Sequence, residues 1–218
     1  MSYISDFKSS AFNLFGVNGG MTSNDSSLAT ATGQRFNSGD YREFVLVQNG
    51  GTALVAGNLI QAPANIGANH SNLAVSPLQA IGATSIQVTS GGTLMTANQY
   101  QGGFAIINAS TGIGQTLRIK SHLAATASGT VTLNLEDPLS VAIATSSKVT
   151  LTLNPYGSQG GTDFSTSGVV VSPTTATGAS IGVTVYPIPA STATVAQYGF
   201  IQTRGFVGCL NDATTAVG

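Results

Sequence analysis

One stretch decides the fold class of this chain: Thr130-Val131-Thr132-Leu133-Asn134-Leu135, in which polar and apolar residues alternate without a break. Successive side chains of a β-strand point to opposite faces, so this alternation is typical of a strand with one buried and one solvated face. The stretch ends at Glu136-Asp137-Pro138, which favours a turn. The period of 3.6 residues that an amphipathic helix needs is not sustained beyond two turns anywhere. The sequence therefore predicts an all-β protein.

Four neighbouring stretches have the same strand-like character and are also bounded by turn-forming residues: 84–89, 103–108, 115–120 and 148–153. Five short strands separated by turns predict a small β-sandwich or barrel. Breaks rich in Pro and Gly, near 63–77 and 154–167, flank this block on both sides. We therefore predict a second β-sandwich lobe over residues 67–160 that is inserted into a base domain.

The base domain is expected to consist of residues 41–66 and 161–218, arranged as a small β-barrel or sandwich. Two β-rich runs, 43–48 and 52–60, flank Asn49-Gly50-Gly51. This pattern is a hairpin signal. Further strand-like runs follow the inserted block at 168–171, 180–186 and 198–207.

Residues 1–40 are predicted to form an extended N-terminal arm. Phe7, Phe12 and Phe15 stand in a segment that is otherwise rich in Gly, Ser and Asn. Their spacing fits one face of a short helix poorly, so we expect them to be partner-binding anchors that dock in separate pockets. A tail that binds nothing is the alternative.

Charge is scarce along the whole chain of 218 residues. Charged residues make up 7%, against about 25% in a typical soluble protein, and residues 44–117 contain no Asp, Glu, Lys or Arg. The net charge is −1 and the seven basic residues are scattered, which predicts no nucleic-acid binding. No apolar run reaches the roughly 18 residues of a membrane span, so we expect no membrane partner. Residues 1–4 do not resemble the start of a signal peptide, which indicates synthesis in a cytoplasm.

Candidate catalytic groups are few. Glu136-Asp137 is the only adjacent acidic pair, and Pro138 favours a turn there over acid–base or Ca²⁺ chemistry. The Gly112-Ile113-Gly114 stretch lacks the Lys of a phosphate-binding loop and is expected to be a β-turn. Three other candidates also lack companions: His70, expected to be a hydrogen-bonding loop residue; His122, expected on the solvated side of a strand end; and Cys209, expected to be buried. We therefore predict a protein that is not an enzyme and that uses no cofactor or metal.

Several stretches together resemble a group of virion proteins of tailed bacteriophages. They are Ala80-Ile81-Gly82-Ala83-Thr84-Ser85-Ile86-Gln87-Val88-Thr89, Thr96-Ala97-Asn98-Gln99-Tyr100-Gln101-Gly102-Gly103, Gly112-Ile113-Gly114-Gln115-Thr116-Leu117-Arg118-Ile119-Lys120-Ser121-His122, Leu135-Glu136-Asp137-Pro138 and Tyr198-Gly199-Phe200-Ile201-Gln202-Thr203-Arg204-Gly205. The resemblance covers about residues 44–210. The outer strands are similar to the small β-barrels of capsid decoration, or cement, proteins.

This resemblance implies a protein without catalytic residues that binds the outside of the head lattice and stabilises it. It also implies the major capsid protein as partner, self-association as a homotrimer, and a location on the capsid surface of the virion. A phage tail or fibre protein that binds a host receptor is the main alternative. A polysaccharide-degrading enzyme would need a carboxylate pair and usually aromatic platforms, yet Trp is absent. A major capsid subunit would need a long helix, which the pattern does not show.

Overall fold

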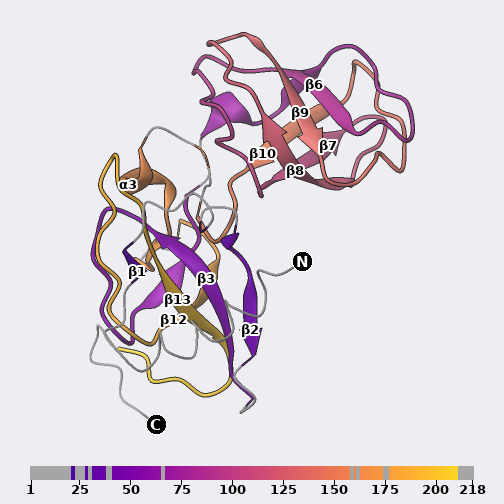
Figure 1. The fold of residues 1–218 in the computed structure, drawn as a ribbon. Coiled ribbons are helices and arrows are strands. Elements are labelled where there is room, and N and C mark those ends of the chain that lie inside the picture. Colours follow the sequence, from indigo (N-terminus) through magenta and orange to yellow (C-terminus); the bar gives the residue numbers. More distant parts are fainter. Residues whose placement is uncertain are drawn as a thin grey trace. The chain divides into compact units, whose positions relative to one another are not determined.

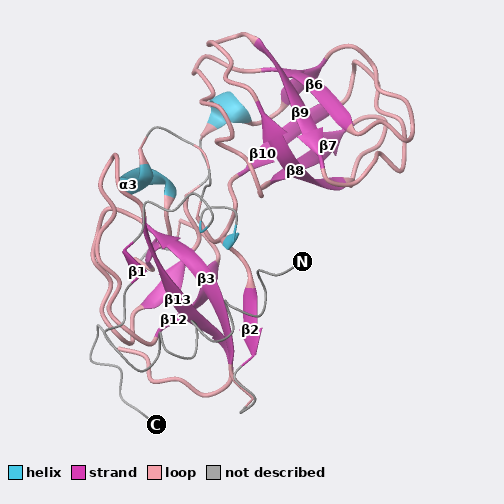
Figure 2. Ribbon diagram, viewed as in Figure 1, coloured by secondary structure: helices cyan, strands magenta, loops and turns pink. Residues whose placement is uncertain are grey.

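The fold is that of a computed structural model, which describes residues 21–22, 28, 31–37, 41–64, 67–157, 160, 163–173 and 177–210. Contacts divide the chain into two compact units: a base of residues 1–62 and 163–218, and a lobe of residues 63–162 (Figure 1). The predicted all-β class is confirmed, because strands make up both units (Figure 2). The helical elements with described bounds are short: the 3₁₀ turn η1, Ala68–His70, and α3, Phe164–Ser167.

The strands of the lobe form a closed antiparallel ring. They are β5 (Leu73–Val75), β6 (Ser85–Thr89), β7 (Phe104–Ala109), β8 (Thr116–His122), β9 (Thr130–Leu135) and β10 (Lys148–Thr152). Their order is β10-β5-β6-β9-β8-β7, and β7 pairs again with β10. All five strands predicted for this block are confirmed. Strand β5 was not predicted, because three residues are too few to show an alternating pattern.

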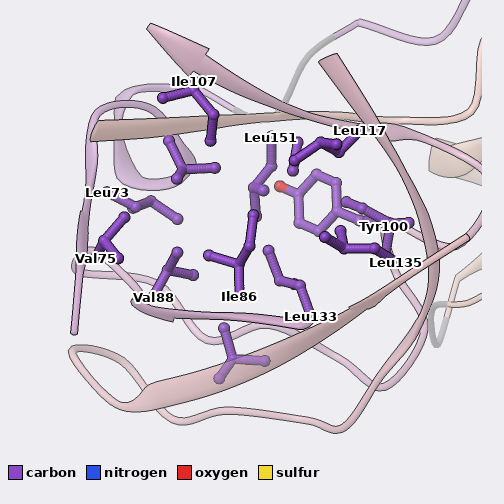
Figure 3. Packing of buried hydrophobic residues seen from close by; sticks show 14 of the residues in the cluster. Leu73, Val75, Ile86, Val88, Tyr100, Ile107, Leu117, Leu133, Leu135 and Leu151 are labelled. Carbon is purple, nitrogen blue, oxygen red and sulfur yellow. The ribbon is translucent and has the colours of Figure 1, made fainter. Parts of the chain in front are cut away.

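The lobe core lies inside the ring and is built by the alternation seen in the sequence. In β9, Val131, Leu133 and Leu135 are buried while the residues between them are exposed. Figure 3 shows the side chains of Leu133 and Leu135 converging with those of the other strands, and with the ring of Tyr100 from the loop after β6. Complete burial of one such aliphatic side chain contributes about 1.5–3 kcal/mol, so the ring is held together mainly by its interior.

The ring has two ends. At one end lie the loops 76–84, 110–115 and 136–147, which we call the lobe tip. The register places them together, because Lys148 at the start of β10 pairs with both Ala74 near the end of β5 and Ala109 at the end of β7. A bridge between Gln79 and Ile143 joins two of the loops directly. The chain enters and leaves the lobe at the opposite end, beside the loops 90–103 and 123–129.

The base is one antiparallel sheet in the order β11-β4-β12-β13-β3-β2. Its strands are β1 (Met21–Thr22), β2 (Arg35–Asn37), β3 (Glu43–Asn49), β4 (Leu59–Gln61), β11 (Val170–Val171), β12 (Ser180–Thr184) and β13 (Gln197–Arg204). Phe44, Leu46, Tyr198 and Phe200 line one face and belong to one buried cluster. The short strand β1 also pairs with β13, at Gln197 and Tyr198.

The hairpin predicted around Asn49-Gly50-Gly51 is wrong. Strand β3 pairs with β2 and β13, and β4 pairs with β11 and β12. The side-chain amide of Asn49 is buried and donates hydrogen bonds to the carbonyl oxygens of Thr52 (2.8 Å) and Pro189 (2.7 Å). These bonds join the chain after β3 to the segment before β13. The chain after β3 therefore does not turn back along β3 to form a hairpin.

The predicted arm of residues 1–40 includes residues that lie in the base. Strand β2 pairs with β3, and Phe36 on β2 contacts Phe200 edge-on with ring centroids 5.1 Å apart. Leu28 and Ala31 are buried in the same cluster. The three anchors predicted for the arm, Phe7, Phe12 and Phe15, lie outside the described residues.

Candidate interaction surfaces

The lobe tip exposes large aliphatic side chains. They come from all three of its loops: Leu78 (65% exposed), Ile81 (67%), Ile113 (65%) and Val141 (48%). Apart from Glu136 and Asp137, where the third loop begins, these loops contain no charged residue. Single exposed aliphatic residues are ordinary on protein surfaces, but several at one end of a unit make that end a candidate interaction surface.

The amide of Gln115 joins two of the three loops of the lobe tip. Its oxygen accepts hydrogen bonds from the backbone N–H groups of Ser140 and Val141 and from the Ser140 hydroxyl, each 3.0 Å long. Its nitrogen donates to the carbonyl oxygens of Val141 (2.9 Å) and Gly112 (3.2 Å). The loop that carries Ile113 is therefore fixed to the loop that carries Val141. A surface ordered before binding loses less conformational entropy when a partner docks.

A second apolar surface lies on the base. It consists of Phe206, Val207 and Leu210, which follow β13, of Val55 in the turn before β4, and of Leu59 at the start of β4. We call it the terminal strip. Phe206 is fully exposed and the other four are between 37% and 56% exposed.

The chain after β13 is attached to the base at two points. The side-chain amide of Gln202 donates to the carbonyl oxygens of Arg204 and Phe206, both at 2.9 Å. The backbone N–H of Leu210 donates to the Gly57 carbonyl oxygen at 2.7 Å. Gly57 has a φ of 88°, and a Cβ there would lie 2.9 Å from Cγ of Leu210. Glycine thus permits both the turn and the close approach of Leu210, so the two halves of the strip are joined.

The most polar part of the lobe interior is a cluster of His70, Tyr100 and His122, all buried. The hydroxyl of Tyr100 bonds Nδ1 of His70, whose Nε2 lies 3.1 Å from the Thr93 hydroxyl. Nδ1 of His122 donates to the Leu123 carbonyl oxygen at 2.9 Å, and Nε2 of His122 accepts the backbone N–H of Tyr100 at 3.0 Å. Because a carbonyl oxygen can only accept and an N–H can only donate, His122 is neutral with its proton on Nδ1.

Burial governs the acid–base behaviour of this cluster. Burial lowers the pKa of His70, which the hydrogen bond to Thr93 partly offsets. Burial likewise lowers the pKa of His122; the bond to the Leu123 carbonyl opposes this shift and the nearby His70 adds to it. Burial raises the pKa of the Tyr100 hydroxyl. Each ring atom that can form a hydrogen bond has a partner within the protein, which indicates a role in stability.

His70 forms hydrogen bonds, as predicted, but it lies in the 3₁₀ turn η1 and not in a loop. The prediction that His122 lies on the solvated side of its strand is wrong. The pairing of β8 with β9 is irregular between Ile119 and Ser121. One shifted residue exchanges the two faces of a strand, so His122 points inward although the earlier alternation placed it outside.

The other candidates from the sequence lie apart. Glu136 forms an exposed ion pair with Arg118 at 3.5 Å. The loop of Gly112 joins β7 to β8 as a turn, as expected. Cys209 was expected to be buried and is exposed, because it follows the last strand and lies on the surface beside Leu210. Among the described residues, no three His, Cys, Asp or Glu side chains are grouped so that they could hold a metal ion.

Neither apolar surface was predicted from the sequence. Leu78 and Ile81 lie between Pro77 and Gly82, and this part of the chain reads as an irregular connection. The one available signal is that several large aliphatic residues stand in segments expected to be turns.

Comparison with models of protein families, with curated proteins and with solved structures finds no match to this chain. Over the residues that the structure describes, no helix combines the length and apolarity needed to cross a membrane.

Proposed function

We propose that this protein is a binding protein of a virus particle rather than an enzyme, and more specifically a decoration protein on the head of a tailed bacteriophage. The observation that carries the proposal is the lobe tip: four exposed aliphatic side chains on nearly uncharged loops that Gln115 holds in place. A rigid, apolar and neutral surface suits docking onto another protein surface of the same character.

The proposed partner is the major capsid protein, on the outside of the head lattice. Burying an exposed aliphatic side chain completely contributes about 1.5–3 kcal/mol, so one tip provides a modest gross gain. Repetition across a lattice, and association into a homotrimer, would raise the overall affinity through multivalency. A protein that binds the assembled lattice and not its separate subunits shifts the equilibrium against disassembly. Phe7, Phe12 and Phe15 are proposed as additional anchors, either on a partner subunit of this protein or on the capsid.

The low charge of the tip also determines how binding should respond to salt. Interactions between exposed charges weaken as ionic strength rises, whereas apolar contacts do not depend on this screening. Binding to capsids should therefore change little between about 0.05 and 0.5 M NaCl, where the Debye length falls severalfold.

Co-sedimentation with purified phage heads tests the role of the tip. Ile81→Ser and Ile113→Ser should each lower the bound fraction. The matched control is Leu123→Ser, since Leu123 is 81% exposed but lies in a loop at the opposite end of the lobe. Equal binding by all three variants and the unchanged protein would contradict a role for the tip.

Immunogold electron microscopy of virions tests the location. Label over the head supports the decoration role, and particles stripped of the protein should then open at a lower temperature. Label confined to the tail tip would instead favour a tail or fibre protein that binds a host receptor.

A further inference from the structure

We infer that the terminal strip is the docking site for residues 1–20 of this protein. The inference rests on the proposed role of Phe7, Phe12 and Phe15 as anchors but not on the capsid as partner. The strip is formed by Phe206, Val207, Leu210, Val55 and Leu59, and it is the largest group of exposed aliphatic and aromatic side chains that we find on the described part of the base.

The direction of β1 brings the preceding chain toward the strip. Met21 pairs with Tyr198 and Thr22 pairs with Gln197, in antiparallel register. Moving from Thr22 back to Met21 therefore follows β13 in its own direction, toward Arg204 and the strip beyond it. Met21, to which residues 1–20 are attached, is thus the end of β1 nearer the strip.

The edge of β13 cannot accommodate this segment for its whole length. Strand β12 pairs with β13 at Ile201 and Gln202, on the same edge that β1 uses at Gln197 and Tyr198. A strand that continued β1 in register would meet β12 within a few residues. Docking of residues 1–20 on the strip therefore requires a path outside the plane of the sheet, because β12 occupies this edge before the C-terminal end of β13.

The length of the segment suffices for this path. Between Tyr198 and Arg204 a strand advances about 20 Å, at roughly 3.3 Å for each residue. Twenty residues reach about 66–72 Å when fully extended. The segment can therefore pass along β13 and still place several residues on the strip.

The chemistry of the two surfaces matches. Residues 1–20 contain three Phe and two charged residues of opposite sign, Asp6 and Lys8. The strip offers Phe206 and four aliphatic side chains, and residues 205–210 contain no charge. Aromatic side chains provide large apolar area together with edge-to-face contacts, so three Phe docked near Phe206 would bury both surfaces at once.

Cys209 supplies the test, because it is the only cysteine of the chain, is exposed, and lies between Val207 and Leu210. A second cysteine, Ser10→Cys, stands between Phe7 and Phe12. Mild oxidation of the purified Ser10→Cys protein, without capsids, should form a disulfide between residues 10 and 209. The control variant carries Ser10→Cys with all three Phe changed to Ser, so its tether has the same length without the anchors. Docking predicts that the disulfide forms at least tenfold faster in the variant that keeps the Phe residues.

Two further measurements decide the outcome. Peptide mapping first identifies the product that contains the disulfide between residues 10 and 209. That product at monomer mass shows docking within one chain, and at dimer mass it shows docking between copies; either supports the inference, whereas dimers joined only by 209–209 or 10–10 disulfides count against it. Changing both Phe206 and Leu210 to Ser in the Ser10→Cys protein should slow formation of the disulfide as much as removing the three Phe residues does. An unchanged circular dichroism spectrum checks that this variant is folded. Equal rates in the Ser10→Cys protein and the anchor-free control would overturn the inference, and the capsid-binding test would remain independent of that result.

Discussion

Replacing Tyr100 by Phe removes one oxygen atom from the middle of the lobe and tests the hydrogen-bonded cluster around it. The aromatic ring stays, so the packing seen in Figure 3 is preserved and no large cavity forms. The hydroxyl of Tyr100 is the partner of Nδ1 of His70, and both residues are at most 1% exposed. The substitution therefore leaves a buried nitrogen without a partner.

The expected cost follows from that orphaned atom. A buried polar group that loses its hydrogen-bond partner destabilises a protein by about 1–3 kcal/mol, so we expect about 2 kcal/mol for Tyr100→Phe. The lobe spans residues 63–162. For a unit of that size, 1 kcal/mol lowers the Tm by about 4–8 °C, which gives about 8–16 °C if the lobe unfolds by itself. Unfolding of the whole chain in one step would halve this shift, to about 4–8 °C.

Differential scanning calorimetry measures both the shift and the number of transitions. Tyr41→Phe is the matched control, since Tyr41 lies on the surface of the base. The free energy of unfolding of this variant should stay within about 0.5 kcal/mol of that of the unchanged protein. A Tyr100→Phe protein whose stability changed by less than about 0.5 kcal/mol would refute the view that the buried cluster holds the lobe together. A shift confined to one of two transitions would also support the predicted autonomy of the lobe.

Acid should destabilise the lobe. The folded-state pKa values of His70 and His122 lie below the unfolded value of about 6.5, so the unfolded chain binds more protons. The free energy of unfolding is therefore lost as the pH falls from about 6.5 through the folded pKa values. A urea-denaturation series from pH 8 to pH 4 measures this loss, and His122→Gln should reduce its slope. Gly103→Ala should lower the free energy of unfolding by about 3 kcal/mol or more, because a Cβ there overlaps the Thr152 carbonyl oxygen. Gly67→Ala is the control: the space around Gly67 is open, so this variant should be nearly neutral in the same assay. Gln115→Ala should lower the free energy of unfolding by no more than about 1–3 kcal/mol, since the bonds it removes are mostly exposed. The same variant should speed hydrogen exchange at Val141, and unchanged exchange there would contradict the role of Gln115 at the lobe tip.

Much of the lobe could be predicted from its sequence, because each strand has one face in a common core. The alternation in 130–135 describes β9 residue by residue. The same logic failed for His122, since an irregular pairing after Ile119 changed which face points inward. Such a shift depends on the partner strand and leaves no trace in the local pattern.

The base was harder to predict because its order depends on contacts between distant segments. The Asn49-Gly50-Gly51 stretch has the composition of a hairpin turn. The side-chain amide of Asn49, however, donates a hydrogen bond to a carbonyl oxygen 140 residues away, that of Pro189. The candidate surfaces were missed for a related reason. The exposure of Leu78 or Leu210 follows from where a loop or a terminal segment lies on the finished unit, which composition alone does not specify.

The closed ring of the lobe has a consequence for solubility. A chain with so little charge lacks the electrostatic repulsion that usually keeps β-rich proteins apart, and an unpaired strand is a template for aggregation. In the ring, each strand from β5 to β10 has a partner on both sides, so no backbone row is left to recruit another molecule. The base sheet ends in strands of two and three residues, β11 and β2, and β2 carries the exposed Arg35. Topology therefore provides the protection against fibre formation that charge provides in other proteins, and many copies can be concentrated in a small volume without joining strand to strand.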